Sequence, residues 1–116
     1  MIKIVLEKNV NIGFNSEVFS GSKVVIGENT LIAAYVYIIG GGHDYSSVDI
    51  PISDQEKPSH GIEIEKNCWI GAGAKVFDNV KIGEDTVIGA GSVVTRDIPA
   101  FSIAAGVPAR VAKKRK

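Results

Sequence analysis

The sequence predicts an all-β chain wound as a parallel β-solenoid, and residues 64–99 carry that prediction. In this stretch an aliphatic residue recurs at every sixth position. A small or β-branched residue follows four positions after each of them, and the residue just before it is Asn, Asp or Gly. A period of six fits neither a helix, whose period is 3.6, nor a half-buried strand, whose period is two. It fits short strands joined by tight corners, which is the structure of hexapeptide repeats.

The recurring positions have distinct roles in such a coil. The aliphatic and the small positions should face the core, whereas Asn, Asp and Gly best tolerate the left-handed backbone of a corner. The aliphatic positions are Ile64, Ile70, Val76, Ile82, Ile88 and Val94. The small positions are Cys68, Ala74, Val80, Thr86 and Ser92, and Ile98 closes the series. The corner positions are Asn67, Gly73, Asn79, Asp85, Gly91 and Asp97.

Residues 10–40 continue the repeat less regularly. The period is kept by Ile26, Ile32 and Ile38, with Thr30 and Val36 at the small positions. Before Ile26 the sequence allows two registers, because that residue comes two positions later than the period requires. Either a corner is enlarged near Lys23, or the register passes through Phe14 and Ser20. We expect coils over residues 10–40 and 62–99 in a single domain, residues 1–116.

Residues 41–61 interrupt the repeat. From Ile38 to Ile64 the chain uses 26 residues where one repeat takes six. Long loops in compact domains tend to be functional or disordered. The apolar run from Ile50 to Ile52 favours an ordered arm.

Residues 100–116 leave the period and are expected to form a C-terminal cap and tail. Phe101, Ile103 and Val107 are candidates for covering the open end of the solenoid, since terminal coils expose an apolar face. After Pro108 we expect the start of a short helix.

Composition excludes several classes of function. The formal net charge is zero, so there is no general attraction to nucleic acid. A single cysteine excludes an internal disulfide framework. We see neither a signal peptide nor a membrane-spanning stretch, which predicts a cytoplasmic protein without membrane insertion. The basic residues at the C-terminus, among them Arg110 and Lys113, are either a solvated tail or a phosphate contact.

Three segments resemble a known family. They are IGENTLIA at 26–33, running on to Gly42-His43, then NCWIG at 67–71, and IGAGSVVTRDIP at 88–99, ending in AGVPA at 105–109. With these segments the chain resembles the left-handed β-helix hexapeptide-repeat acyltransferases. Within them it is most similar to galactoside and maltose O-acetyltransferases and to sugar acetyltransferases of polysaccharide biosynthesis. One departure is Asp44, which follows the histidine where the family often has proline.

The resemblance implies left-handed winding, a homotrimer with active sites between subunits, and acetyl-CoA as co-substrate. The implied reaction moves an acetyl group to a hydroxyl of a sugar or nucleotide-sugar acceptor, by direct attack on the thioester. Two alternatives stay open: an N-acetyltransferase acting on an amino sugar, and a non-catalytic trimeric scaffold.

An alcohol acceptor needs a general base, and neutral imidazole is the usual one near pH 7. The chain has only two histidines. His43 follows a run of glycines at the point where the repeat breaks, and the resemblance makes it the base, whereas His60 is expected to be structural or solvent-facing. Asn15 and Asp44 are candidates for orienting His43, and Glu17 is a weaker one.

The resemblance also assigns binding residues. Asp44 and Trp69 would contact the acceptor, although an outward Trp69 could instead pack between subunits, together with the outward Phe77, Val87 and Val93. The backbone near Gly71 and Ala72 would hold the oxyanion. CoA would contact Gly71, Ala72, Ala90, Thr95, Arg96, Arg110 and Lys113. No metal site is expected, because the related solenoid carbonic anhydrases need three histidines. Cys68 falls at a small core position, so we interpret it as a packing residue rather than a nucleophile.

Overall fold

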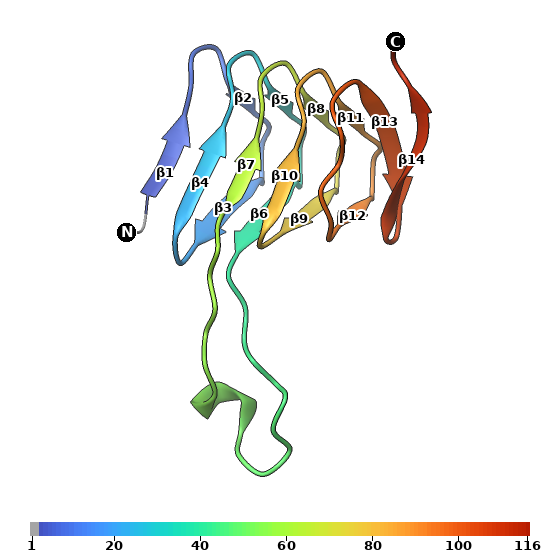
Figure 1. Cartoon of the computed structure of the whole chain (residues 1–116). Coiled ribbons are helices and arrows are strands. Elements are labelled where there is room, and N and C mark those ends of the chain that lie inside the picture. Colours follow the sequence, from blue (N-terminus) through green and yellow to red (C-terminus); the bar gives the residue numbers. More distant parts are fainter. Residues whose placement is uncertain (1–2) are drawn as a thin grey trace.

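The computed structural model describes residues 3–116, which form a parallel β-solenoid with one long arm (Figure 1). Three sheets make the sides of a prism. Sheet A contains β1 (Lys3–Leu6), β4 (Lys23–Ile26), β7 (Ile62–Ile64) and β10 (Val80–Ile82). Sheet B contains β2 (Asn11–Ile12), β5 (Leu31–Ile32), β8 (Trp69–Ile70), β11 (Val87–Ile88), β13 (Ser102–Gly106) and β14 (Ala109–Lys114). Sheet C contains β3 (Glu17–Ser20), β6 (Tyr37–Gly40), β9 (Lys75–Phe77) and β12 (Val93–Val94).

Each coil visits sheets A, B and C in turn and then stacks on the coil before it. Residues at the same repeat position therefore lie side by side: Ile26 pairs with Ile64, and Ile64 pairs with Ile82. The solenoid predicted from the six-residue period is confirmed, and its winding is consistent with the predicted left-handed β-helix.

The predicted inward positions form the core. All six aliphatic positions between Ile64 and Val94 are fully buried, and the small positions from Cys68 to Ser92 are at most 2% exposed. Burying an aliphatic side chain of this size contributes about 1.5–3 kcal/mol. The narrow prism is thus stabilised by a column of Ile and Val along its axis.

Most of the predicted corner residues have the left-handed backbone conformation that a corner requires. Five of the six predicted corner residues have positive φ, between 57° and 73°. Asp97 is the exception, and its carboxylate instead accepts a hydrogen bond from the Lys81 backbone N–H at 2.8 Å. Tyr35 and Phe101 also have positive φ, near 60°, a conformation that is costly for bulky side chains.

The structure settles the N-terminal register. Ile12 pairs with Ile32 and Val18 pairs with Ile38, so both belong to the inward columns. The extra residues lie in the corner between Ser20 and Lys23, which confirms the enlarged corner and excludes the register through Phe14 and Ser20. The coils also start earlier than residue 10, because β1 already stacks on β4.

The C-terminal segment differs from the prediction. No helix begins after Pro108; instead β14 runs back antiparallel to β13. Val107 is 73% exposed and Ile103 lies on the outer face beside Val87, so neither closes the prism. The buried residues here are Ala104 and Ala109. A second extended strand satisfies the edge of β13 with backbone hydrogen bonds, which a helix could not do.

No helix within residues 3–116 has the length and apolar character needed to cross a membrane.

The core column can be tested by truncating one of its members. Ile70→Ala removes a fully buried side chain between two neighbouring coils, and we expect it to lower the free energy of unfolding by about 2–5 kcal/mol. Chemical denaturation at fixed protein concentration measures this. Glu63→Ala, at an exposed position on sheet A, is the control and should change stability by less than about 0.5 kcal/mol. Equal effects of the two substitutions would contradict the inward assignment.

Candidate active site at the arm

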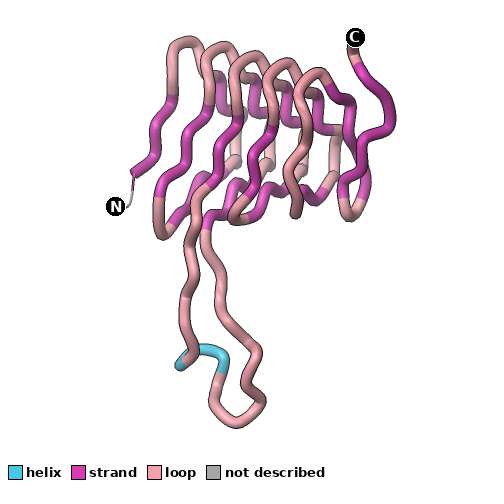
Figure 2. The backbone as a smooth tube through the Cα atoms, in the orientation of Figure 1, coloured by secondary structure: helices cyan, strands magenta, loops and turns pink. Residues whose placement is uncertain are grey.

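The arm, residues 41–61, leaves the prism between β6 and β7. Its outgoing and returning segments run side by side, as Figure 2 shows. They are joined by backbone hydrogen bonds, from the Gly42 N–H to the Pro58 carbonyl at 3.1 Å and from the Asp44 N–H to the Glu56 carbonyl at 2.8 Å. The predicted ordered arm is therefore confirmed.

The tip of the arm is organised around Gln55. This side chain is only 9% exposed, although the arm projects away from the core. Its amide nitrogen donates to the Ser47 carbonyl at 2.9 Å and the Ile50 carbonyl at 3.1 Å, and its oxygen accepts from the Ser47 N–H at 3.2 Å. A short 3-10 helix, η1 (Ile52–Asp54), precedes it. One buried amide thus fixes the fold of the tip.

Asp78, in the next coil, holds the base of the arm. Its carboxylate accepts hydrogen bonds from the backbone N–H groups of His60, at 2.9 Å, and Gly61, at 2.9 Å. Partial burial by itself would raise the pKa of Asp78, but the N–H donors of Gly61, His60 and Gly41 outweigh it and lower the pKa below its usual range. The ionised carboxylate therefore fastens the returning end of the arm to the prism.

His43 lies on the outgoing segment with its side chain exposed. It borders two hollows. One, of about 410 Å³, also contains Phe19, Ile39 and the glycines that precede the histidine. The other, of about 600 Å³, lies on the arm itself and includes Tyr45. An accessible imidazole between two concave surfaces can reach a bound molecule in either of them.

The Asp44 carboxylate forms a local hydrogen bond within the arm. It accepts this bond from the Ser46 N–H at 2.9 Å, and this contact lowers the pKa of Asp44. The carboxylate therefore stays ionised beside His43. Among residues 3–116 no hydrogen bond joins Asp44 or Asn15 to His43, so the residue that orients the imidazole remains a prediction.

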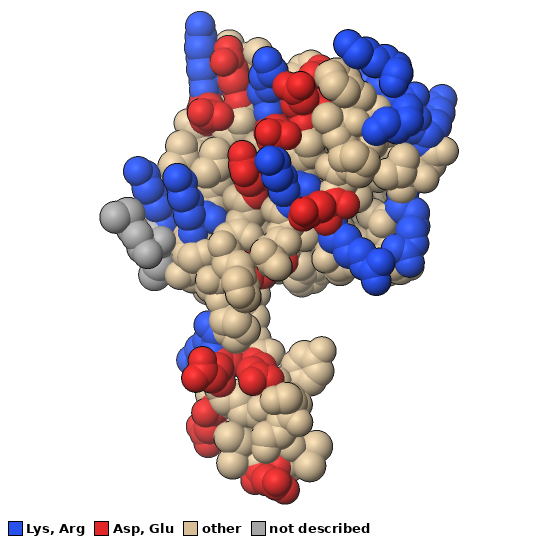
Figure 3. Space-filling view, viewed as in Figure 1, with Lys and Arg blue, Asp and Glu red and all other residues tan. Residues whose placement is uncertain are grey.

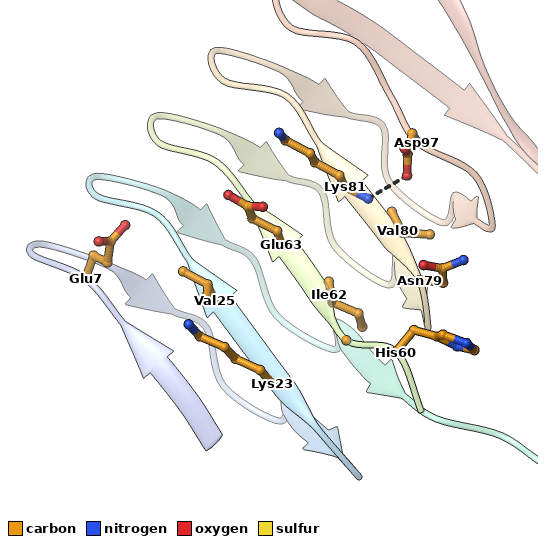
Figure 4. A pocket seen from close by; sticks show the side chains of 11 residues that line it. Glu7, Lys23, Val25, His60, Ile62, Glu63, Asn79, Val80, Lys81 and Asp97 are labelled. Atoms are coloured by element: carbon orange, nitrogen blue, oxygen red, sulfur yellow. Dashed lines mark hydrogen bonds between the residues drawn. The ribbon is translucent and has the colours of Figure 1, made fainter. Parts of the chain in front are cut away.

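His60 behaves as the sequence suggested. Its side chain is 63% exposed and its Nδ1 lies 3.2 Å from an Asp78 carboxylate oxygen. It borders a third hollow, of about 620 Å³, on the outer face of sheet A (Figure 4). That hollow mixes side chains of both charge signs, Lys23 and Lys81 with Glu63 among them, and it lacks His43. We therefore place the candidate site at the arm and not at this hollow.

The other predicted site residues fall into separate groups within one chain. Asn15 lies at the corner between sheets B and C, with φ of 56°, and Gly71, Ala72 and Ala90 line the same corner two and three coils further on. The coils approach closely there, since a Cβ on Gly71 would lie 2.6 Å from the Ala90 nitrogen. His43 leaves from the next corner along the chain, between sheets C and A. A single chain does not bring the two groups together.

The remaining predicted residues lie toward the C-terminal end. Thr95 and Arg96 are exposed at the corner between sheets C and A, and Arg110 and Lys113 are exposed on β14. Figure 3 shows Lys and Arg side chains gathered at this end, whereas the charged side chains of the arm are mostly acidic. Trp69 is 53% exposed on the outer face of sheet B, as expected for an outward residue.

Cys68 is confirmed as a packing residue. It is 2% exposed, and its thiol donates to the Gly83 carbonyl at 3.2 Å. Burial raises the pKa of the Cys68 thiol to about 11, so it stays protonated and is a poor nucleophile. Within residues 3–116 no three His, Cys, Asp or Glu side chains are grouped as a metal site would need.

Sequence reasoning missed Asp78 and Gln55. Asp78 precedes a predicted corner residue, and its role depends on where a distant loop returns to the prism. Gln55 lies in a polar stretch whose only signal was the nearby Ile50–Ile52 run. Tyr35 was also missed, because the other residues at its corner are Asn15, Gly73 and Gly91.

Known proteins share this architecture. Residues 61–96 match the family described as bacterial transferase hexapeptide (six repeats), and residues 3–40 match the hexapeptide repeat of succinyl-transferase. The maltose O-acetyltransferase structure from Clostridium difficile 630 superimposes with a TM-score of 0.75 at 31% identity, over 98% of this chain and 67% of that one. The chain belongs to the hexapeptide-repeat transferases.

Two further relatives are similar over nearly the whole chain. The galactoside O-acetyltransferase of Escherichia coli K12 is 38% identical over 112 residues, which is 92% of this chain and 52% of the relative. A mutant of AntD, an N-acyltransferase from Bacillus cereus in complex with dTDP-4-amino-4,6-dideoxyglucose and coenzyme A, superimposes with a TM-score of 0.87 at 25% identity, over 98% of this chain and 64% of that one. The chain spans about half the length of the curated relatives it matches.

The role of Asp78 can be tested at the base of the arm. Asp78→Asn removes the negative charge and leaves one oxygen to accept the N–H groups of His60 and Gly61, so these amides should exchange hydrogen at least tenfold faster. Asp97→Asn, at an exposed corner, is the control and should leave the arm amides unchanged.

The same contact predicts a pH dependence. A carboxyl whose pKa is lowered on folding stabilises the arm fully above the ordinary pKa of Asp, and this contribution is lost as the pH falls through the lowered value. Exchange at His60 and Gly61 should therefore accelerate, after correction for intrinsic rates, only at strongly acidic pH. Unchanged protection in Asp78→Asn at neutral pH would contradict the assignment.

Proposed function

We propose that this protein is an acetyl-CoA-dependent acetyltransferase that modifies a hydroxyl of a sugar or nucleotide sugar, with His43 as general base. The observation that carries the proposal is an accessible histidine on an ordered arm of a hexapeptide-repeat prism. The similarity to the galactoside and maltose O-acetyltransferases supports acetyl transfer, and CoA in the AntD complex supports the co-substrate.

The chemistry follows from the residue types. Acetyl-CoA supplies an acetyl group activated as a thioester. His43 takes the proton of the acceptor hydroxyl as its oxygen attacks the carbonyl carbon, and the carbon–sulfur bond then breaks. The departing sulfur takes this proton from His43, so that neutral His43, the free thiol of CoA and the acetyl ester are the products. In the Gly71–Ala72 stretch the Ala72 N–H would stabilise the oxyanion, since the Gly71 N–H already donates to the Ile88 carbonyl at 2.8 Å.

Two outer faces of the prism favour a homotrimer. On sheet B, Leu31, Trp69, Val87 and Ile103 are in register. On sheet C, Phe19, Ile39 and Phe77 are in register. Phe14 and Tyr35 pack edge to face at the corner between these sheets, with ring centroids 5.6 Å apart. By contrast, the outer face of sheet A is largely charged (Figure 4). Contiguous apolar faces of this kind are typical of interfaces.

A threefold arrangement would also complete the site. If sheet B of one copy faces sheet C of the next, the corner that carries His43 lies beside the neighbour's sheet B, where Trp69 is exposed. The acceptor would then bind between Trp69 of one subunit and His43 with Asp44 of another. The arrangement would thus bring together Trp69 and His43, which a single chain leaves apart.

The coils leave room for CoA at the C-terminal end. Ala72, Ala90 and Thr95 are small and exposed, so the pantetheine chain can lie against the backbone. Arg96, Arg110 and Lys113 are exposed there, and cationic side chains bind phosphates well.

A second candidate is N-acetylation of an amino sugar. The TM-score of 0.87 to the AntD complex, which contains an amino sugar linked to dTDP, favours it. An amine that loses its proton to His43 would attack the same carbonyl carbon, so the site chemistry is shared. A non-catalytic scaffold is the third possibility, and it predicts no turnover with any acceptor.

The base can be tested by comparing the two histidines. His43→Ala should lower kcat by about 10²–10⁴-fold, which is the usual contribution of a general base, while the oligomer stays intact. His60→Ala is the matched control, because His60 is exposed and lies on the returning end of the same arm. It should retain most of the wild-type rate. An unchanged rate in His43→Ala would rule out its role as the base.

The proposed interface can be tested on sheet C. Phe19→Glu places a charge in the apolar row of β3, β6 and β9, so it should convert trimers to monomers in analytical ultracentrifugation. Val25→Glu, on the outer face of sheet A, introduces the same charge and should leave the trimer intact. If Val25→Glu dissociated the trimer and Phe19→Glu did not, the interface would lie on sheet A, and the proposed interface would be wrong.

A further inference from the structure

The pairing of the arm places Lys57 beside His43. Two backbone hydrogen bonds join the outgoing and returning segments, from Gly42 to Pro58 and from Asp44 to Glu56. Both bonds fit one antiparallel register, in which residues 43 and 57 lie directly opposite each other between the two bonds. Directly opposite residues project from the same face of a two-stranded ribbon, and they approach closest at positions between the hydrogen bonds. His43 and Lys57 therefore form a pair on one face of the arm.

Lys57 gives this face of the arm a positive charge. It is the only Lys or Arg between residues 41 and 61, where four residues are acidic. Both His43 and Lys57 line the hollow of about 410 Å³, and none of the described residues that line it is acidic. The ion pairs within residues 3–116 involve His60, Lys66 and Lys81, so the exposed ammonium of Lys57 is unpaired there. This hollow thus has an available cation next to the imidazole.

The opposite face of the arm is acidic. Successive residues of an extended segment point to opposite faces, so Asp44 and Glu56 project away from the face that carries Lys57. Both acidic residues line the hollow of about 600 Å³ that His43 also borders, and no Lys or Arg of the described chain lines it. The imidazole of His43 is therefore placed between a cationic hollow and an acidic one.

The rest of the cationic hollow has the character of a small-molecule site. Phe19 and Ile39 form its apolar side, and its volume lies within the range of about 300–1,000 Å³ that is typical of ligand pockets. At Gly42 an added Cβ would have no atom within 4 Å, so there is open space directly before His43. A sugar ring can therefore pack its C–H face on the apolar side while its polar groups reach His43 and Lys57.

We propose that Lys57 selects an acceptor that carries a negatively charged group, a phosphate or a carboxylate, close to the hydroxyl that is acetylated. This inference rests on the proposed function, because it takes His43 as the base. The ammonium would bind the anionic group, and the Asp44 carboxylate, which only accepts hydrogen bonds, would bind neutral hydroxyls of the sugar. Asp44 and Glu56 would repel an anion from the acidic hollow. The two faces of the arm would thus fix the orientation of the acceptor.

Matched acceptors provide the test. Thiol release from acetyl-CoA is measured with glucose, galactose and N-acetylglucosamine, each as the neutral sugar, the 1-phosphate and the UDP derivative, and with glucuronate and galacturonate as carboxylates. We expect kcat/KM of the wild type to be about tenfold or more higher for charged acceptors than for their neutral parents, because the ammonium forms a charge-assisted hydrogen bond. Activity with the phosphates or with the carboxylates supports the proposal and identifies the anionic group.

The variants of Lys57 show whether its charge is responsible. Lys57→Ala should raise KM for charged acceptors by about tenfold or more, and should change kcat and KM for acetyl-CoA by less than about twofold. Lys57→Arg keeps the positive charge and should keep KM within about threefold of the wild type. Lys66→Ala, which removes an exposed lysine at the corner between sheets A and B, is the control and should behave as the wild type.

Three kinetic results overturn the proposal. The first is equal use of neutral and charged acceptors by the wild type. The second is a KM that rises equally for neutral and charged acceptors in Lys57→Ala, because the residue would then act only through the structure of the arm. The third is a rise in KM for acetyl-CoA instead of the acceptor, because Lys57 would then bind the phosphates of CoA.

A binding measurement separates this inference from the proposed function. Glucose 1-phosphate and glucuronate are titrated into the nitrogen-15-labelled full chain without acetyl-CoA, while the amide NMR signals of residues 41–61 are followed. Shifts at His43 and Lys57 that are lost in Lys57→Ala support the anion site even if no acceptor is acetylated, in which case the proposed function alone fails. If neither probe shifts these signals and no charged acceptor is acetylated, the selection by Lys57 is overturned.

Discussion

The fold depends on the parallel backbone ladder that stacks each coil on the one before it. Because the coils lie about 4.8 Å apart, any residue has a counterpart of the same role directly above and below it. This constraint makes Ile26, Ile64 and Ile82 neighbours although they are distant in sequence. It also requires glycine where coils come closest, as at Gly27, where a Cβ would lie 2.5 Å from the Lys66 nitrogen. Each side chain must therefore pack against the coil above and the coil below as well as within its own coil.

The same ladder explains how a narrow prism can carry an arm. The chain can leave one corner and return to it only if the coils on either side keep their stacking, and β6, β7 and β9 do so. Asp78 attaches the arm to the prism, because its carboxylate accepts hydrogen bonds from N–H groups at the returning end of the arm. The attached arm presents His43 at a fixed place relative to the sheets, which a flexible loop could not do. This position is what supports the proposal that His43 is the base.

The solenoid and its core were predictable because each repeat position occurs in several coils. The inward assignment of Ile70 and Ala74 therefore rests on the similar residues at the same position of the other coils. The tail was not predictable, since β14 forms only through pairing with β13, and its own sequence carries no period. His43 stands out in the sequence because the repeat breaks there, and its role as the base, which the family resemblance implies, stays a prediction. The contacts of Asp78 and the conformation of Tyr35 depend on distant segments, so no local pattern indicates them. The separation of Asn15 from His43 became visible only in three dimensions.

The most direct test of the proposed function is the release of free thiol from acetyl-CoA by the full chain, measured with a panel of sugars, amino sugars and nucleotide sugars. The proposal predicts thiol release that requires both the protein and one class of acceptor, with the acetyl group recovered on that acceptor. If only acceptors with a free amine are active, the acetyl group is transferred to nitrogen instead of oxygen. No release with any acceptor, together with no binding of CoA in calorimetry, would contradict the acetyltransferase function and leave the prism as a scaffold.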